Sequence, residues 1–81
     1  MVYRTKGVCS QLINVEVEGD IIASVEFIGG CNGNTKGVAA LVEGMNVHEA
    51  IRRLEGIKCG PRSTSCPDQL SKALRLAIGE N

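Results

Sequence analysis

The run Leu12–Glu18, which reads LINVEVE, is followed by Gly19-Asp20 and then by Ile21–Ile28, and these residues decide the fold. Apolar and polar residues alternate in both outer segments, which is typical of β-strands with one buried and one hydrated face. Gly19-Asp20 favours a tight turn, so we predict an antiparallel hairpin, with Val2–Lys6 as a third strand. In the second strand we expect four side chains on the core face: Ile21, Ala23, Val25 and Phe27.

The pattern changes to helical spacing after the hairpin. A loop rich in glycine and asparagine, residues 29–34, precedes a short helix that we expect over Thr35–Glu43. Asn46 is a good N-cap for a second helix that ends at Gly56, and Glu49 has the spacing of a capping box. Pro67 suits the first position of a third helix, with Cys66 at or beside its cap. Each of these two helices has an apolar stripe at helical spacing: Val47, Ala50, Ile51 and Leu54 in the second, and Leu70, Ala73, Leu74, Ala77 and Ile78 in the third.

Strands followed by helices indicate the α+β class. We predict a small antiparallel sheet of three strands, followed by three helices that pack on one face of it. The 81 residues are enough for one domain only, residues 1–81, and the hydrophobic fraction of 43% is typical of a globular chain.

Composition excludes several classes of function. The net charge is zero, which argues against a dedicated nucleic-acid-binding protein, and with aromatic residues at 2% of the chain the stacking platforms for bases are missing. The apolar runs are too short to span a membrane. The segment MVYRTKGVCS lacks the apolar core of a secretory signal, so we expect a cytoplasmic protein.

Four cysteines, Cys9, Cys31, Cys59 and Cys66, are the candidate functional residues. None forms a C-x-x-C pair, but each falls at the end of a predicted element, where loops can converge at one edge of the sheet. In the cytosol, such cysteines favour metal or redox chemistry over lasting disulfides. A helix amino terminus, expected at Cys66, favours the thiolate that binds metal. Lys6, Lys58 and Arg62 lie close in sequence to three of the thiols and can offset their charge.

Three interpretations of the cysteines remain open: a metal site, thiol redox work, and plain core packing, since cysteine is often buried. Other residues give weaker signals. His48 falls off the apolar stripe of its helix, so we expect it in solvent. Glu49, Arg52, Arg53 and Glu55 have the pattern of a solvated face, and with one histidine no catalytic triad is predicted.

The run Thr64-Ser65-Cys66-Pro67-Asp68 resembles the TSCPD-domain family. That domain also occurs at the carboxyl end of adenosylcobalamin-dependent ribonucleotide reductases, where a metal-binding role is suspected. The resemblance implies a ribonucleotide reductase or another protein as a partner. Because 81 residues cannot hold the reductase barrel, we expect no catalysis by this chain alone. The likeness extends over Phe27–Asn34, Leu41–Met45, Glu49–Ile51 and Gly56–Gly60.

The order of elements and thiols is also similar to the U-type scaffold proteins of iron–sulfur cluster assembly. In that resemblance Cys9, Cys31 and Cys66 match the three scaffold thiols, and Glu43–Ala50 matches a helix start. Ser10-Gln11 replaces the Gly-Asp of the scaffolds, and Cys59 is an added thiol. A closed site of four sulfurs suits structural Zn²⁺ better than a transferable cluster.

The sequence therefore predicts a zinc-binding accessory module with Cys9, Cys31, Cys59 and Cys66 as ligands. One alternative is a protein that binds or delivers an iron–sulfur cluster. Another is a thiol redox accessory of ribonucleotide reduction, in which Cys59 and Cys66 form a disulfide that is reduced again.

Overall fold

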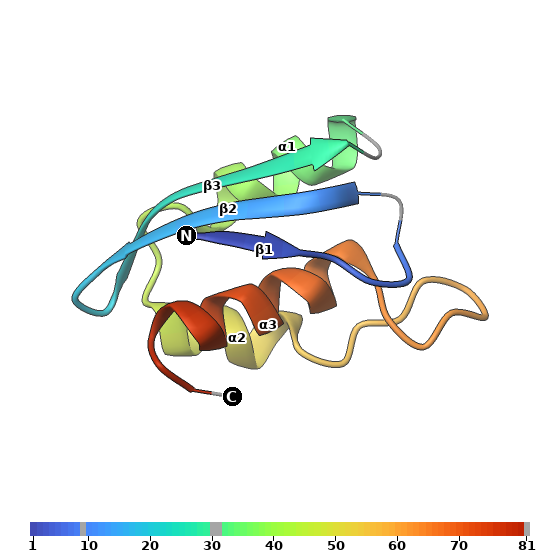
Figure 1. Cartoon of the computed structure of the whole chain (residues 1–81). Coiled ribbons are helices and arrows are strands. Elements are labelled where there is room, and N and C mark those ends of the chain that lie inside the picture. Colours follow the sequence, from blue (N-terminus) through green and yellow to red (C-terminus); the bar gives the residue numbers. More distant parts are fainter. Residues whose placement is uncertain (9, 30–31, 81) are drawn as a thin grey trace.

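The chain folds into a three-stranded sheet with three helices on one side of it (Figure 1). The computed structural model describes residues 1–8, 10–29 and 32–80. The strands lie in the order β1-β2-β3, and each neighbouring pair is antiparallel. The predicted α+β class and element order are confirmed. The elements are β1 (Val2–Arg4), β2 (Ser10–Glu18), β3 (Ile21–Gly29), α1 (Asn32–Val42), α2 (Val47–Leu54) and α3 (Cys66–Ala77).

The hairpin of β2 and β3 turns at Gly19-Asp20, as predicted, and Gly19 adopts a φ of +60° that glycine accepts readily. The core face of β3 differs from the prediction near the turn. Glu16 pairs with Ser24 but Val17 pairs with Ile22, so β3 carries one extra residue between these pairs. Such a bulge moves the preceding residues to the opposite face.

As a result, Ile22 is fully buried, whereas Ile21 is 45% exposed and Ala23 is exposed. The expectation that Ile21 and Ala23 face the core is therefore wrong, because strict alternation does not anticipate a bulge. Beyond the bulge the alternation holds: Val25 is buried and Phe27 is half-buried.

One hydrophobic core lies between the sheet and the helices. α1 packs on β3, α3 packs on β2, and α2 packs against α3. The apolar stripes predicted for α2 and α3 supply much of it, with Val47, Ala50 and Ile51 from the former. Its buried members are Ile13, Val15, Ile22, Val25, Ala39, Val42, Val47, Ala50, Ile51, Leu70, Ala73 and Leu74.

The link between α1 and α2 runs along the outer edge of β3. Ile22 donates its backbone N–H to the carbonyl of Met45 at 3.0 Å and accepts from the N–H of Gly44 at 2.8 Å. Further along, the Glu43 carboxylate accepts a hydrogen bond from the N–H of Val25 at 3.0 Å. These bonds protect an edge that would otherwise offer groups to another strand.

The helix boundaries follow the prediction closely at α2 and less closely elsewhere. Asn46 caps α2, and its side chain accepts from the N–H groups of His48 and Glu49. α1 begins at Asn32 rather than Thr35, because packing of Thr35, Ala39 and Val42 against the sheet outweighs the weak helix propensity of Asn and Gly.

Candidate functional site

Cys66 is the first residue of α3, and its neighbours in sequence fix the start of that helix. Ser65 adopts extended angles (φ −153°, ψ 170°), and its hydroxyl oxygen accepts a hydrogen bond from the N–H of Asp68 at 3.1 Å. A serine N-cap thereby satisfies an N–H that has no partner inside the helix. Pro67 is the second helical residue, one position later than predicted. Cys66 therefore lies where the helix dipole favours negative charge.

The loop between α2 and α3 is closed by two side chains of the Thr64–Asp68 run. The Asp68 carboxylate accepts from the Gly56 N–H at 2.8 Å and from the Thr64 hydroxyl at 2.5 Å. The Ser65 hydroxyl donates to the carbonyl of Ile57 at 2.6 Å. Asp68 and Ser65 are 5% and 4% exposed, so these bonds form in a medium of low dielectric constant. The two ends of the loop are thus held together.

Cys59 begins a tight turn inside this loop. Its N–H donates to the carbonyl of Thr64 at 3.2 Å, and its carbonyl accepts from the N–H of Arg62 at 3.0 Å. Gly60, the next residue, has a φ of +57°, which is strained for residues with a side chain. The backbone of Cys59 is therefore fixed on both sides, while its side chain is exposed.

Gln69 joins the same loop to the segment that follows β1. Its amide oxygen accepts from the Lys6 N–H at 3.1 Å and from the Tyr3 hydroxyl at 3.3 Å. Its amide nitrogen donates to the hydroxyl oxygen of Thr64 at 2.9 Å. Gln69 is 3% exposed, and its bonds to Tyr3, Lys6 and Thr64 are partly buried.

The charge on Asp68 follows from these contacts. Burial raises the pKa of its carboxyl, but the hydrogen bonds from Thr64 and Gly56 and the positive charge of Lys72 outweigh burial and lower it. Asp68 is therefore ionised at neutral pH. Burial, together with the negative charge of Asp68, raises the pKa of Tyr3, so its hydroxyl stays protonated as a donor.

A cavity of about 420 Å³ opens beside this network and is lined mainly by apolar groups. Its walls come from four places: the segment before β2, the first turns of α1, the loop between α2 and α3, and the start of α3. The lining residues are Val8, Asn34, Thr35, Val38, Ile57, Lys58, Cys59, Arg62, Ser65, Cys66 and Pro67.

Of the four predicted ligands, the structure brings two to this cavity. Cys59 and the half-buried Cys66 both line it. Cys9 and Cys31 lie outside the described residues. Within residues 1–8, 10–29 and 32–80, no three His, Cys, Asp or Glu side chains cluster closely enough to hold a metal ion.

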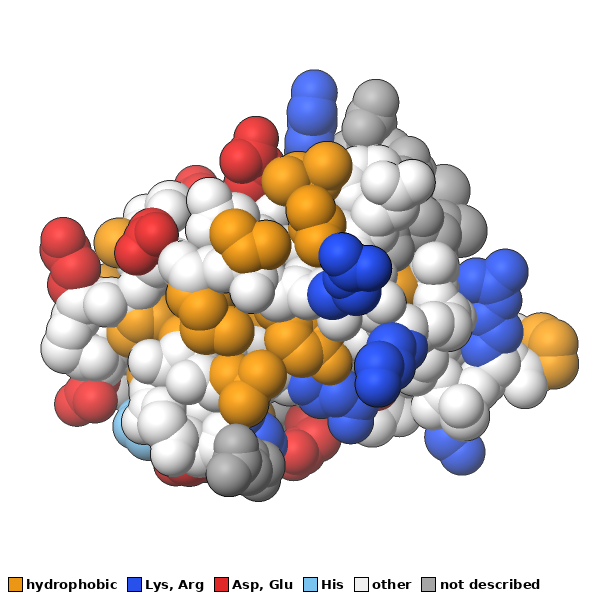
Figure 2. Space-filling view, in the orientation of Figure 1, with side chains coloured by type: hydrophobic (Ala, Val, Ile, Leu, Met, Phe, Trp, Pro, Cys, Tyr) orange, Lys and Arg blue, Asp and Glu red, His pale blue; other side chains and the backbone are white. Residues whose placement is uncertain are grey.

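Charged side chains are unevenly distributed over the surface. In Figure 2 acidic groups gather toward the end with the hairpin turn, and basic groups gather toward the opposite end. The loop between α2 and α3 lies at that basic end (Figure 1), and it contributes Lys58 and Arg62 to the cavity wall. The cavity is therefore bordered by positive charge.

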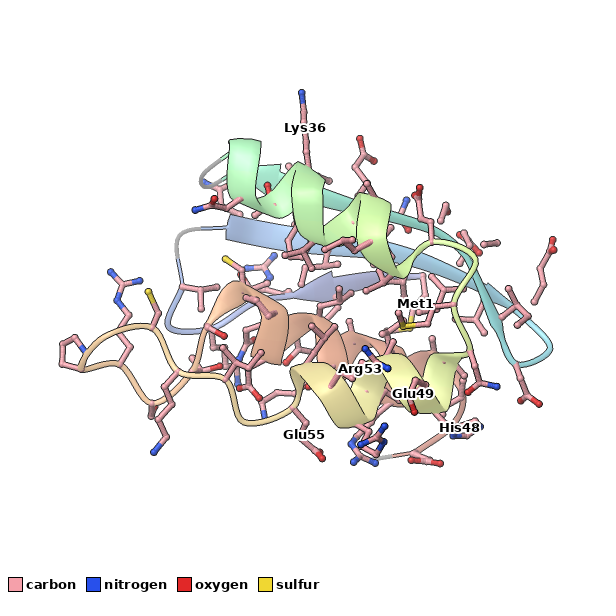
Figure 3. The ribbon with its side chains drawn as sticks, turned by 180° about the vertical axis from the view of Figure 1, so that it is seen from behind. Met1, Lys36, His48, Glu49, Arg53 and Glu55 are labelled. Carbon is pink, nitrogen blue, oxygen red and sulfur yellow. The ribbon has the colours of Figure 1, made fainter. Side chains whose placement is uncertain are left out.

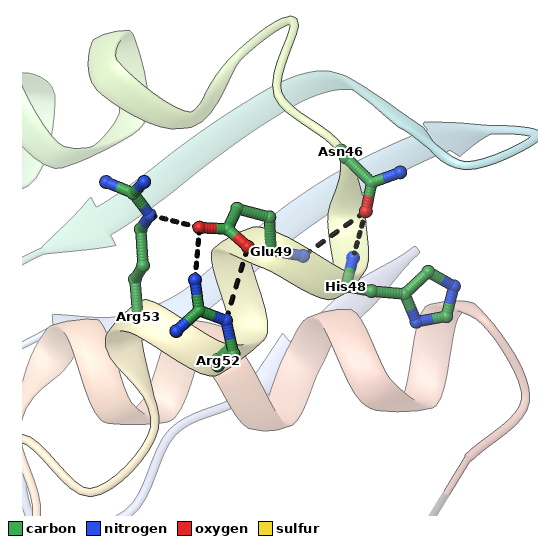
Figure 4. Close-up of polar contacts among 5 residues, drawn as sticks. All are labelled: Asn46, His48, Glu49, Arg52 and Arg53. Carbon is green, nitrogen blue, oxygen red and sulfur yellow. Dashed lines mark hydrogen bonds and ion pairs between the residues drawn. The ribbon is translucent and has the colours of Figure 1, made fainter.

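The solvated face predicted on α2 is confirmed. His48 points away from the body of the protein (Figure 3), Arg52, Arg53 and Glu55 are exposed, and Glu49 is half-buried. The Glu49 carboxylate accepts from the guanidinium groups of Arg52 and Arg53, both at 2.6 Å (Figure 4). These bonds lower the pKa of Glu49. The Glu49 carboxylate bonds to the arginines and not to the backbone N–H of Asn46. Of the two bonds of a capping box, α2 therefore has the one that the Asn46 side chain accepts.

The polar junction of Thr64, Asp68 and Gln69 is not among the predicted functional residues. The sequence does contain a pattern that indicates Asp68, because Ser65 and Asp68 have the S-x-x-D spacing of a capping box. The partner groups on Gly56, Tyr3 and Lys6 are distant in sequence, and no local pattern points to them.

These features define a small α+β domain in which two cysteines line one cavity. The chain belongs to the TSCPD domain family, whose model matches residues 1–78. No curated protein and no solved structure matches it. Among the helices of the described residues, none has the length and apolar character needed to cross a membrane.

Proposed function

We propose that this chain is a zinc-binding accessory module in which Cys9, Cys31, Cys59 and Cys66 hold one Zn²⁺. The observation that carries the proposal is the cavity, because the segments that border it adjoin all four cysteines. Cys59 and Cys66 line it directly, Val8 adjoins Cys9 in sequence, and Asn34 lies shortly after Cys31.

The register of the sheet supports this proposal. Ser10, which follows Cys9, pairs with Gly29, which lies two positions before Cys31. Consecutive Cα atoms are about 3.8 Å apart, so a shared site for residues 9 and 31 near this end of the sheet is compatible with the pairing of Ser10 and Gly29. Val8 and Asn34 bring the cavity to the same end.

The donor set also fits zinc. Four thiolates give the tetrahedral sulfur site typical of structural zinc, and the zinc would supply folding free energy rather than catalysis. Structural zinc contributes about 10–16 kcal/mol of apparent binding free energy, which is large for so small a core. Lys58 and Arg62 at the cavity offset the excess negative charge of four thiolates and one Zn²⁺.

The test is the metal content of protein purified without oxygen. We expect about one zinc per chain, loss of zinc in Cys59→Ser and in Cys66→Ser, and unfolding by a strong chelator. His48→Ala is the matched control, because His48 is an exposed potential ligand on α2, and it should keep its zinc. Full zinc content in both cysteine variants would contradict the proposal.

An iron–sulfur cluster is the second candidate, and the size of the cavity favours it. About 420 Å³ is more space than a single ion needs, and its rim carries Lys58 and Arg62, which suit an anionic cluster. Protein purified without oxygen should then be brown, with sulfur-to-iron charge-transfer absorption. A colourless protein with stoichiometric zinc excludes this candidate.

Membership of the TSCPD family also leads us to propose a ribonucleotide reductase as the partner. A thiol redox role in that reaction would use Cys59 and Cys66, which share the cavity. It requires a Cys59–Cys66 disulfide that thioredoxin reduces. Mass spectrometry of alkylated peptides before and after oxidation tests it, and thiols that stay alkylatable under both conditions count against it.

A further inference from the structure

One carboxylate, that of Asp68, connects the two segments that carry Cys59 and Cys66. Asp68 lies in the first turn of α3, two residues after Cys66. Its oxygen atoms hold Gly56 at one end of the loop and Thr64 at the other, at 2.8 and 2.5 Å. The loop that carries Cys59 is therefore closed onto the helix that carries Cys66.

The connection continues from Thr64 to Cys59. The carbonyl of Thr64 accepts the N–H of Cys59 at 3.2 Å, and the hydroxyl of Thr64 is held by Asp68 and Gln69. Thr64 also packs against the segment after β1, where a Cβ on Gly7 would lie 3.2 Å from its methyl group. Asp68 thus acts on the position of Cys59 through Thr64, and Cys66 is fixed by the same helix turn.

We propose that Asp68 is a positioning residue that holds Cys59 and Cys66 as a preformed pair of thiols. The hydrogen bonds named above belong to residues other than Cys9 and Cys31, so the proposed pair is a half-site that binds a thiophilic ligand by itself. The relevance of the half-site to zinc rests on the proposed function, but its existence does not. Because the loop is ordered before binding, less conformational entropy is lost when a ligand bridges the sulfurs.

The probe is phenylarsine oxide, which condenses with two thiols to form two As–S bonds and release one water. It is applied to the reduced Cys9→Ser/Cys31→Ser variant, in which Cys59 and Cys66 are the remaining thiols. We expect a one-to-one adduct by mass spectrometry. Thr64→Val should bind about tenfold more weakly or worse, because it leaves a buried carboxylate oxygen without its donor. Thr64→Ser keeps the hydroxyl, so its affinity for phenylarsine oxide should stay close to that of the Cys9→Ser/Cys31→Ser protein without a change at Thr64.

Two results would overturn the half-site. One is a folded Cys9→Ser/Cys31→Ser protein that forms no adduct. The other is equal affinity for phenylarsine oxide in the Thr64→Val and Thr64→Ser proteins. If the double serine variant does not fold, the series is repeated in the full chain and the arsenic is located by peptide mass spectrometry. Arsenic on any pair other than Cys59 and Cys66 then contradicts the inference.

Zinc affinity in the full chain gives a second readout. Loss of a group that orients metal ligands commonly weakens metal binding about 10- to 100-fold, and we expect this in Asp68→Asn and Thr64→Val at temperatures where both are folded. One outcome is that the chain binds no zinc while Thr64→Val still binds phenylarsine oxide more weakly than Thr64→Ser. In that case the positioning role stands and the proposed function fails. Weakened zinc binding with unchanged arsenical affinity refutes the half-site.

Discussion

Two adjacent isoleucines test the bulge that sets the face of β3. Ile22 is fully buried in the core, whereas Ile21 is 45% exposed. Replacing a buried isoleucine by alanine removes apolar contact and leaves a cavity, at a cost of about 2–5 kcal/mol. At Ile21 the side chain is only partly buried, so Ile21→Ala should cost about 1 kcal/mol or less.

The difference should be large in a protein of this size. For a domain of 60–100 residues, 1 kcal/mol corresponds to about 4–8 °C in Tm, so a loss of about 3 kcal/mol at Ile22→Ala lowers Tm by roughly 12–24 °C. Urea unfolding followed by circular dichroism, with reductant and a fixed zinc concentration, measures the free energy of unfolding of both variants under the same conditions. The two substitutions have the same chemistry, so each serves as the control for the other.

The result that would refute this reasoning is an Ile21→Ala protein that loses as much stability as Ile22→Ala, or more. That result means an unbroken alternation along β3, with Ile21 on the core face. It would also change the pairing with β2 of every β3 residue between Gly19 and Ser24.

Three further predictions concern polar contacts. Asn46→Ala should destabilise the chain by about 1 kcal/mol in urea unfolding, because it removes the N-cap of α2, while Asn46→Asp should be nearly neutral. Glu49 should titrate below the ordinary value of 4.5 by NMR, so its stabilising effect is complete above that pH and is lost as the pH falls through the lowered value; Arg52→Ala should raise its pKa. Glu43→Ala should speed hydrogen exchange of the Val25 amide by about tenfold or more, since the carboxylate accepts that N–H, and an unchanged rate would count against the bond.

Much of the fold could be predicted from the sequence because its signals are local. Alternation predicts β2, helical spacing predicts the buried faces of α2 and α3, and Asn46 predicts the start of α2. The bulge in β3 is a different matter. It depends on how Ile22 and the link at Met45 fit against the helices, and period-two patterns contain no information on that packing.

The candidate site divides in the same way. Cysteine chemistry and element ends indicate Cys59 and Cys66, which the structure places on one cavity. The Asp68 network could not be predicted in full, because the Asp68 carboxylate binds Gly56, twelve positions away, and Gln69 binds Tyr3 across the whole chain. Contacts of this range arise only once the helices are packed.

The most direct test of the central claim is X-ray absorption at the zinc edge of protein purified without oxygen. The account predicts one zinc per chain with four sulfur neighbours at about 2.3 Å. Zinc bound mainly by nitrogen and oxygen, or protein isolated without oxygen that contains no metal, would contradict the claim that Cys9, Cys31, Cys59 and Cys66 share one ion.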